Sequence, residues 1–177
     1  MFSAIYIEEE VRDWHRVQEI IQPFTDTPKI ICERYGEIFN NTNQNFRIQK
    51  KAPALILAKK YGNLVLPSPG GYGFEGGKSF YFSHMLNCIY DCRYCFLQGM
   101  YRSANYVLFV NYDDFESQII ENIRSQNEGS ISIAVMTAIA WRLSLLVGSV
   151  STSYTYLRCI LKLFWKLEQK VPRFVVC

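Results

Sequence analysis

Three cysteines lie close together near the middle of the chain, at Cys88, Cys92 and Cys95. The gaps of three and two residues let one short loop present three thiolates to a common centre. Thiolates are the ligands that suit iron–sulfur clusters, and three of them leave the fourth iron of a [4Fe–4S] cube open. The spacing, with the aromatic Tyr94 directly before the last cysteine, therefore predicts a [4Fe–4S] cluster in a loop after a strand.

The same residue types permit other interpretations. A zinc site would use His84 together with the three cysteines, since sites with three cysteines and one histidine exist. Buried inert thiols or a disulfide are a further alternative. The other cysteines, Cys32, Cys159 and Cys177, lack such spacing, and we expect them to be structural or incidental.

Composition indicates a globular chain of one domain: 177 residues, 49% hydrophobic and 20% charged. The N-terminal sequence MFSAIYIEEEV turns acidic at once, unlike a secretory leader, so a cytoplasmic location is expected. Cysteines clustered in a reducing compartment more often bind metal or do chemistry than form disulfides.

The net charge of +3 is unevenly distributed. Residues 1–130 carry 15 acidic and 13 basic side chains, whereas residues 131–177 carry six basic side chains and a single acid, Glu168. Such a change indicates a domain boundary, a tail with a different partner, or a different origin for the sequence.

The hydrophobic pattern predicts several strands and two helices. Residues 4–21 start extended and continue as a helix, with apolar residues at helical spacing from Val11 to Ile21. The apolar runs 29–33 and 54–58 predict buried strands, and the aromatic-rich run 78–84 predicts a strand leading into the cysteines. Residues 111–125 predict a helix capped by Asn111, and its apolar stripe consists of Phe115, Ile119, Ile120 and Ile123.

Residues 131–150 are almost entirely apolar or small, with Arg142 as their one charge. Hydropathy alone would predict a membrane span. A buried strand followed by a helix explains the same pattern, and so does a stretch of sequence that is foreign to the rest of the chain.

Other candidate sites are weaker. The segment GGYGFEGGKS is similar to a phosphate-binding loop, but Tyr72 stands where glycine is needed and a strand follows. We expect the lysine pairs at 50–51 and 59–60 to be solvated. Three tyrosines could stack on nucleobases but more commonly pack in cores: Tyr101, Tyr106 and Tyr112.

The segment FYFSHMLNCIYDCRYCFLQGMYRSANYVLFVNYDDF resembles the spore photoproduct lyase family of radical S-adenosylmethionine proteins, and the resemblance covers residues 1–130. It implies an α/β fold with a partial (β/α)6 barrel after a small α/β N-terminal region. It also implies that Cys88, Cys92 and Cys95 bind the cluster and that S-adenosylmethionine binds its open iron. A 5′-deoxyadenosyl radical would then cleave a thymine dimer in damaged DNA, with electrons from a donor such as a flavodoxin or ferredoxin.

The length departs from that family. Only 89 residues follow Cys88, whereas a six-unit barrel at roughly 30 residues per unit needs about 180. Residues 135–149, back-translated and read one nucleotide out of step, give YDCDSLALEPVSGF with permitted codons. This resembles the segment that the family has after its second barrel strand. We therefore expect an N-terminal region at 1–77, the start of a barrel at 78–130 and an out-of-frame tail at 131–177.

Three functions follow from these patterns. The first is a radical lyase acting on DNA photoproducts, truncated here and weakly active or inactive. The second is a non-catalytic zinc or iron–sulfur module that binds nucleic acid. The third is a membrane-associated remnant, with residues 131–150 as the span. The sequence identifies no catalytic residue and no obligate protein partner.

Overall fold

The computed structural model describes residues 2–39, 44–68, 77–87, 100–125 and 130–135. Strands dominate these residues, with one long helix and several short ones. The elements follow one another as β1 (Ile5–Glu8), η1 (Glu9–Val11), α1 (His15–Ile21), β2 (Lys29–Cys32), η2 (Tyr35–Glu37), α2 (Phe46–Lys51), β3 (Leu55–Ala58), β4 (Val65–Pro67), β5 (Gly77–Phe82), β6 (Met85–Leu86), β7 (Tyr106–Phe109), α3 (Tyr112–Ser125) and β8 (Ser130–Val135).

A five-stranded sheet in the order β2-β1-β3-β7-β6 forms the larger half of the structure. All of its pairs are parallel except β6 with β7. Strand β3 lies at the centre and is fully buried, which agrees with the buried strand that the sequence predicts at 54–58. Because both faces of a central parallel strand are covered, such a strand is apolar at every position rather than at every second one.

Alternate residues of the central strands face two different cores. Leu55 and Leu57 pack with Leu108 on the side that α1 covers. Ile56 and Ala58 pack with Phe109 on the opposite side. This period of two places the sheet between α1 on one face and the η2 and α3 segments on the other.

The helix predicted within residues 4–21 is present, but only its second half is α-helical. Val11 lies in η1, and α1 begins after Trp14. Val17 and Ile20 of α1 are buried against β1 and β3, as their spacing predicts.

Strand β2 corrects one expectation. The sequence predicts a buried strand at 29–33, and the strand is present, but Ile30 and Ile31 are 41% and 45% exposed. The strand lies at the edge of the sheet, where it pairs with β1 alone among the described residues. An apolar run thus marks a strand here without marking its burial.

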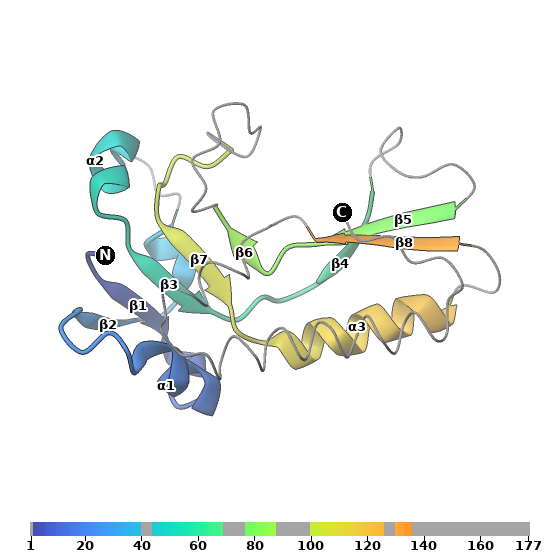
Figure 1. Cartoon of the computed structure of the whole chain (residues 1–177), viewed down its shortest axis with the longest axis horizontal. Coiled ribbons are helices and arrows are strands. Elements are labelled where there is room, and N and C mark those ends of the chain that lie inside the picture. Colours follow the sequence, from blue (N-terminus) through green and yellow to red (C-terminus); the bar gives the residue numbers. More distant parts are fainter. Residues whose placement is uncertain (1, 40–43, 69–76, 88–99, 126–129, 136–177) are drawn as a thin grey trace.

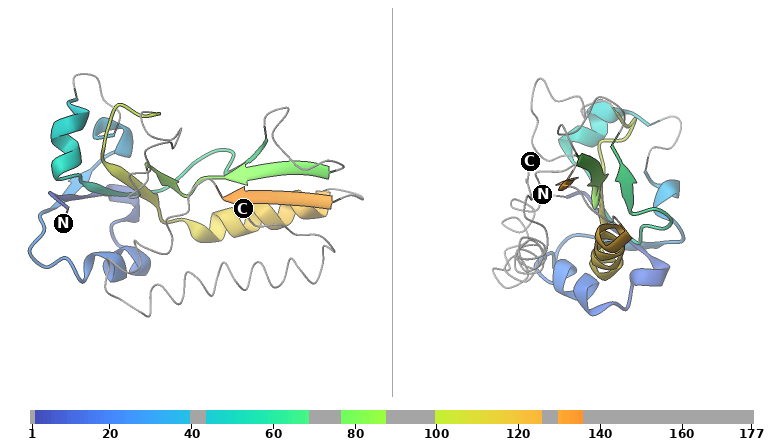
Figure 2. Two further views of the ribbon diagram at one scale, coloured as in Figure 1. Left: turned by 45° about the horizontal axis from the view of Figure 1, so that its top comes forward. Right: turned by 90° about the vertical axis from the view of Figure 1, so that its right-hand side faces the viewer.

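A smaller sheet, in the order β4-β5-β8, continues beside the first one (Figure 1). Strand β5, predicted at 78–84, pairs antiparallel with β4 and parallel with β8. Helix α3 runs along this sheet, as both views in Figure 2 show. Its residues Phe115 and Ile119 pack with Phe82 and Val65, which confirms the predicted apolar stripe at these two positions.

The sequence did not predict α2, β4, β6 or β7. Helix α2 is short. Asn45, the residue before it, caps its first turn, since the Asn45 side chain accepts a hydrogen bond from the Ile48 N–H at 3.1 Å. Asparagine at this position satisfies one of the free N–H groups of the first turn. Strands β4 and β6 have only three and two residues, which is too short for a pattern of period two to be visible.

Residues 130–135 form strand β8, so the apolar stretch predicted at 131–150 begins as a strand. The remainder of that stretch lies outside the described residues. Within the part of the chain that the structure describes, no helix has the length and apolar character to cross a membrane.

Candidate functional site

The predicted cluster ligands Cys88, Cys92 and Cys95, together with Tyr94, lie outside the described residues, so they stay predictions. Among the residues that the structure does describe, no group of histidine, cysteine and acidic side chains could bind a metal. The structure does describe the two chain segments on either side of the cysteine motif. The first ends at Asn87, directly before Cys88, and the second begins at Met100.

Asn87 connects the two ends of the cysteine loop. Its side-chain Nδ2 donates hydrogen bonds to the carbonyls of Ser103 at 2.6 Å and Asn105 at 2.7 Å. Its backbone has φ 63°, in the left-handed region that asparagine tolerates better than most residues. The chain therefore turns sharply at the residue before Cys88 while the side chain stays bonded to the returning segment.

The returning segment is itself fixed by buried polar contacts. Ser103 and Asn105 are 0% and 7% exposed. The Asn105 Oδ1 accepts a hydrogen bond from the Ala54 N–H at 3.0 Å, at the start of β3. Gln49 of α2 accepts from the Ala104 N–H at 3.0 Å through its Oε1. The base of the cysteine loop is thus joined to β3 and α2, and no sequence motif indicated these residues.

A cavity of about 590 Å³ lies beside this base. Asn87 and Met100, the last and first described residues on either side of the cysteine loop, both line it. Much of its wall is aromatic, and Lys60 is the one charged residue among the described residues that line it. The rings belong to Tyr35, Phe39, Tyr81, Tyr101 and Phe109.

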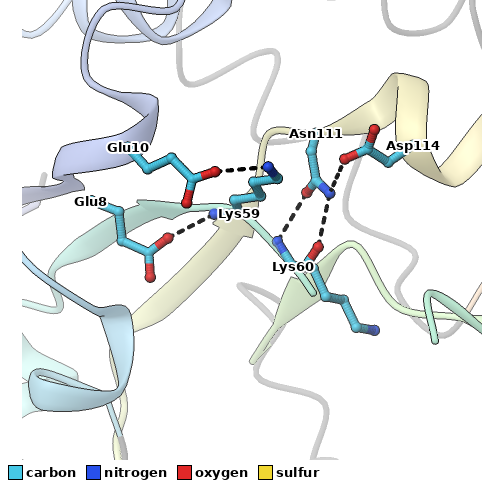
Figure 3. Close-up of polar contacts among 6 residues, drawn as sticks. All are labelled: Glu8, Glu10, Lys59, Lys60, Asn111 and Asp114. Atoms are coloured by element: carbon cyan, nitrogen blue, oxygen red, sulfur yellow. Dashed lines mark hydrogen bonds and ion pairs between the residues drawn. The ribbon is translucent and has the colours of Figure 1, made fainter. Parts of the chain in front are cut away.

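The two lysines that follow β3 are both half-buried but have different partners. Lys59 donates to Glu10 Oε1 at 2.7 Å, whereas Lys60 lines the cavity. Figure 3 shows the Lys59 ammonium meeting Glu10 and the Lys60 ammonium pointing away from both glutamates. The prediction of a solvated pair at 59–60 is therefore wrong for Lys60. Successive side chains of an extended segment point to opposite sides, and here one side leads to Glu10 and the other to the cavity.

Asn111 also acts differently from its prediction as a helix cap. Its Oδ1 accepts a hydrogen bond from the Lys60 N–H at 3.0 Å, and its Nδ2 donates to the Lys60 carbonyl at 2.9 Å. The first turn of α3 bonds instead to the Asn111 backbone carbonyl, at 3.2 Å from the Asp114 N–H. The side chain thus joins the segment after β3 to the start of α3 (Figure 3).

Glu8 is a buried carboxylate at the end of β1, with 1% exposure. Its two oxygens accept hydrogen bonds from the backbone N–H groups of Tyr35 at 2.8 Å and Lys59 at 2.9 Å. Buried carboxylates need such partners because an unsatisfied charge in the interior is costly. Glu8 thereby joins η2 to the end of β3, close to the cavity that Tyr35 and Lys60 line.

His84 is interior rather than poised as a ligand. It is 2% exposed, and its ring lies 6.3 Å from Phe82 and 6.4 Å from Tyr112, centroid to centroid. Burial, and secondly the charge of Lys60, lowers the pKa of His84 to about 4. His84 is thus a buried residue just after β5.

The three tyrosines divide between the two expected uses. Tyr106 and Tyr112 pack against the core on the α1 side, and the Arg16 guanidinium lies 4.6 Å from the Tyr112 ring centroid. Tyr101 lines the cavity, with its ring 5.1 Å from that of Phe39. Only Tyr101 is therefore placed where it could stack on a ligand.

These features define a mixed α/β protein with a mainly parallel sheet and a cavity lined by Asn87 and Met100, the described residues on either side of the cysteine motif. The described fold is similar to that of solved spore photoproduct lyases. A double mutant with bound AdoMet and dinucleoside spore photoproduct has a TM-score of 0.59 and 16% identity over 78% of this chain. The lyase complexed with dinucleoside spore photoproduct has a TM-score of 0.60 and 16% identity over 83%. A cysteine-to-serine mutant has a TM-score of 0.61 and 14% identity over 83%.

The resemblance to spore photoproduct lyase is thus confirmed at the level of the fold. The chain spans 40% to 43% of the length of these solved structures. No protein-family model matches the sequence, and neither does any curated protein. At this identity the likeness concerns the fold, and the chemistry depends on the chain's own residues.

Proposed function

We propose that this chain is a partial radical S-adenosylmethionine protein of the spore photoproduct lyase type, comprising the N-terminal region and the first half of a (β/α)6 barrel. The observation that carries the proposal is the coincidence of two independent features. The fold matches spore photoproduct lyase, and the cysteine motif begins directly after Asn87, a residue that follows β6 and lines the cavity.

The donor set fits the cofactors of that family. Three thiolates in one short loop suit a [4Fe–4S] cluster with one open iron, and Tyr94 lies within the same loop. When bound, the cluster and S-adenosylmethionine would supply a 5′-deoxyadenosyl radical for cleaving a dimeric photoproduct in damaged DNA. Two solved neighbours bind dinucleoside spore photoproduct, which supports this substrate class.

The chain's own described residues would orient and enclose this chemistry. Asn87 fixes the two ends of the cysteine loop relative to each other. The proposal further includes an electron donor such as a flavodoxin or ferredoxin and a cytoplasmic location.

The tail is part of the same proposal. We infer that residues 131–177 are read out of frame from the gene of a longer relative, and that the shift lies just before Met136. Residues 1–77 would then be the N-terminal region and residues 78–130 the start of the barrel. Sequencing the gene tests this, since an intact family frame must lie beside the present one. A continuous gene without such a frame would refute it.

Anaerobic reconstitution with iron and sulfide tests cluster binding. We expect a brown protein whose broad visible absorption is bleached by dithionite, and loss of this absorption in Cys88→Ala, Cys92→Ala or Cys95→Ala. Cys32→Ala is the matched control, because Cys32 is a buried free cysteine whose pKa is raised to about 11, chiefly by burial. A colourless protein that binds zinc stoichiometrically would instead support the non-catalytic module.

Activity is tested separately. The reconstituted chain is incubated with S-adenosylmethionine, dithionite and dinucleoside spore photoproduct, and 5′-deoxyadenosine and repaired dinucleotide are measured by chromatography. We expect little or no repaired product, because this chain spans about two fifths of the solved lyases. Repair at the rate of a full-length lyase would contradict the partial-barrel interpretation.

A further inference from the structure

Lys60 is an ammonium group without an anionic partner among the described residues. Its Nζ donates one hydrogen bond, to the Ser83 carbonyl at 3.1 Å, and no described carboxylate forms an ion pair with it. A lysine ammonium has three donors, so two are left over. The neighbouring Lys59, in contrast, is neutralised by Glu10 at 2.7 Å.

The surroundings of the Lys60 ammonium are apolar. It lies 5.7 Å from the ring centroids of both Phe109 and Phe115. Lys60 is half-buried, and this burial lowers the pKa of its ammonium group from the ordinary value. A partly desolvated charge gains more from an anion than an exposed one, because screening by water is weaker.

The chain keeps Lys60 in this position. Asn111, which is 3% exposed, bonds both the N–H and the carbonyl of Lys60, and its own Nδ2 also donates to Asp114 Oδ2 at 2.9 Å. The Lys60 backbone is therefore fixed to the start of α3. The side chain reaches the cavity wall from a rigid base, as ligand-binding groups need to do.

The rest of the cavity suits a flat, largely apolar molecule. Its volume of about 590 Å³ lies in the range of small-molecule sites, roughly 300–1,000 Å³. Tyr35, Tyr81 and Tyr101 all line it, and each carries an aromatic ring and a hydroxyl group. Burial raises the pKa of Tyr35 and of Tyr101, so these phenols stay neutral and can donate hydrogen bonds.

We propose that this cavity is a binding site for a planar organic anion, with the carboxylate or phosphate of the ligand on Lys60 and its ring system against the tyrosines. Such sites combine an apolar enclosure with a few fixed polar groups that set orientation. An ammonium–anion hydrogen bond is about twice as strong as a neutral one, so the charge would dominate selectivity. The proposal does not depend on the cluster or on lyase activity.

Isothermal titration calorimetry on the full chain tests it with three probes of the same shape: naphthoate, naphthyl phosphate and the neutral naphthalenemethanol. We expect the wild-type chain to bind at least one anion about tenfold or more tightly than the alcohol. The anion that binds more tightly then assigns the ligand class as carboxylates or phosphates. Equal affinity for the alcohol and both anions would overturn the proposal.

Two neighbouring lysines give a matched pair of variants. Lys60→Met should lose the preference for the anion, and Lys60→Arg should retain it. Lys59→Met should behave as the wild-type chain, because Lys59 points away from the cavity. Retention of the preference in Lys60→Met, or an equal loss in Lys59→Met, would overturn the proposal.

A further variant covers the case in which Lys60→Met does not fold. Tyr101→Leu removes one ring of the cavity and leaves the charge in place. We expect it to weaken the binding of the anion and of the alcohol alike by several-fold. Unchanged affinities would place the probes elsewhere and overturn the proposal.

Discussion

The Asn111 side chain forms hydrogen bonds with both backbone polar groups of Lys60, at 3.0 Å to its N–H and 2.9 Å to its carbonyl. This amide replaces the strand partner that the chain loses after β3, where the Val110 N–H makes the last bond, to the Ala58 carbonyl. The segment after β3 and the start of α3 are thus fixed to each other, and the residue so fixed carries the one charge among the described residues of the cavity wall.

Replacing Asn111 by alanine should destabilise the protein by about 1–3 kcal/mol, because two partly buried backbone groups of Lys60 lose their partners. Urea unfolding of Asn111→Ala against the wild type measures this. Asn63→Ala, an exposed asparagine, is the control and should change stability by less than about 0.5 kcal/mol. An Asn111→Ala variant as stable as its control would show that water replaces the amide.

Glu8→Gln tests the buried carboxylate. The substitution keeps one oxygen acceptor but places an NH2 group against the N–H of either Tyr35 or Lys59. One hydrogen bond is therefore replaced by a repulsive contact between two donors. We expect a loss of about 1–3 kcal/mol in the free energy of unfolding. Glu9→Gln, at an exposed neighbour, is the control. Equal stability of the two variants would contradict this role.

Asn87→Gly separates the two roles of Asn87. Glycine accepts φ 63° without strain but lacks the amide that bonds Ser103 and Asn105. We expect faster proteolysis of the cysteine loop and less iron retained after anaerobic reconstitution, with near-wild-type circular dichroism. Asn122→Gly, in α3, controls for a general effect of glycine. Unchanged proteolysis and iron content would show that backbone geometry alone positions the loop.

His84 should make stability depend on pH. Its folded pKa of about 4 lies below the ordinary 6.5, so the unfolded chain binds the extra proton between these values. The contribution of His84 to the free energy of unfolding, about 3 kcal/mol, is therefore fully present above pH 6.5. It is lost as the pH falls towards 4. Urea unfolding across this range should show a smaller fall in His84→Phe than in the wild type.

A direct measurement supports that comparison. In a His15→Gln background His84 is the only imidazole, since the chain has 2 histidines. Its ring signals in NMR should not titrate until the pH approaches 4. A titration midpoint at or above pH 6 would contradict the buried position of the ring.

Ile31→Lys tests the exposed edge strand. Ile31 is 45% exposed on β2, and an apolar edge invites pairing between chains. We expect Ile31→Lys to reduce aggregation, measured by light scattering, and to change the free energy of unfolding by less than about 0.5 kcal/mol. Ile7→Lys, at the register partner that is 3% exposed, should instead unfold the protein. If Ile31→Lys leaves aggregation unchanged, the chains associate through a surface other than the edge of β2.

Local patterns were sufficient for β3, β5 and α3, but they did not predict β7. The runs around Leu55 and Phe80 gave β3 and β5, and the stripe from Phe115 to Ile119 gave the buried face of α3. They failed for β2, because an apolar run carries no information about whether a second strand or a helix covers it. They also failed for β4 and β6, which exist only through their pairing with β5 and β7.

The sequence by itself was enough to predict a cluster site at Cys88, Cys92 and Cys95, since ligand chemistry depends on residue type and on the spacing within one short segment. It also determined the resemblance to spore photoproduct lyase that the fold confirms. Only the tertiary structure decided that Lys60 faces a cavity while Lys59 faces Glu10, and that Asn111 and Asn87 fix the segments around it. These contacts join residues up to 51 positions apart, and no local pattern encodes which distant backbone a side chain will reach.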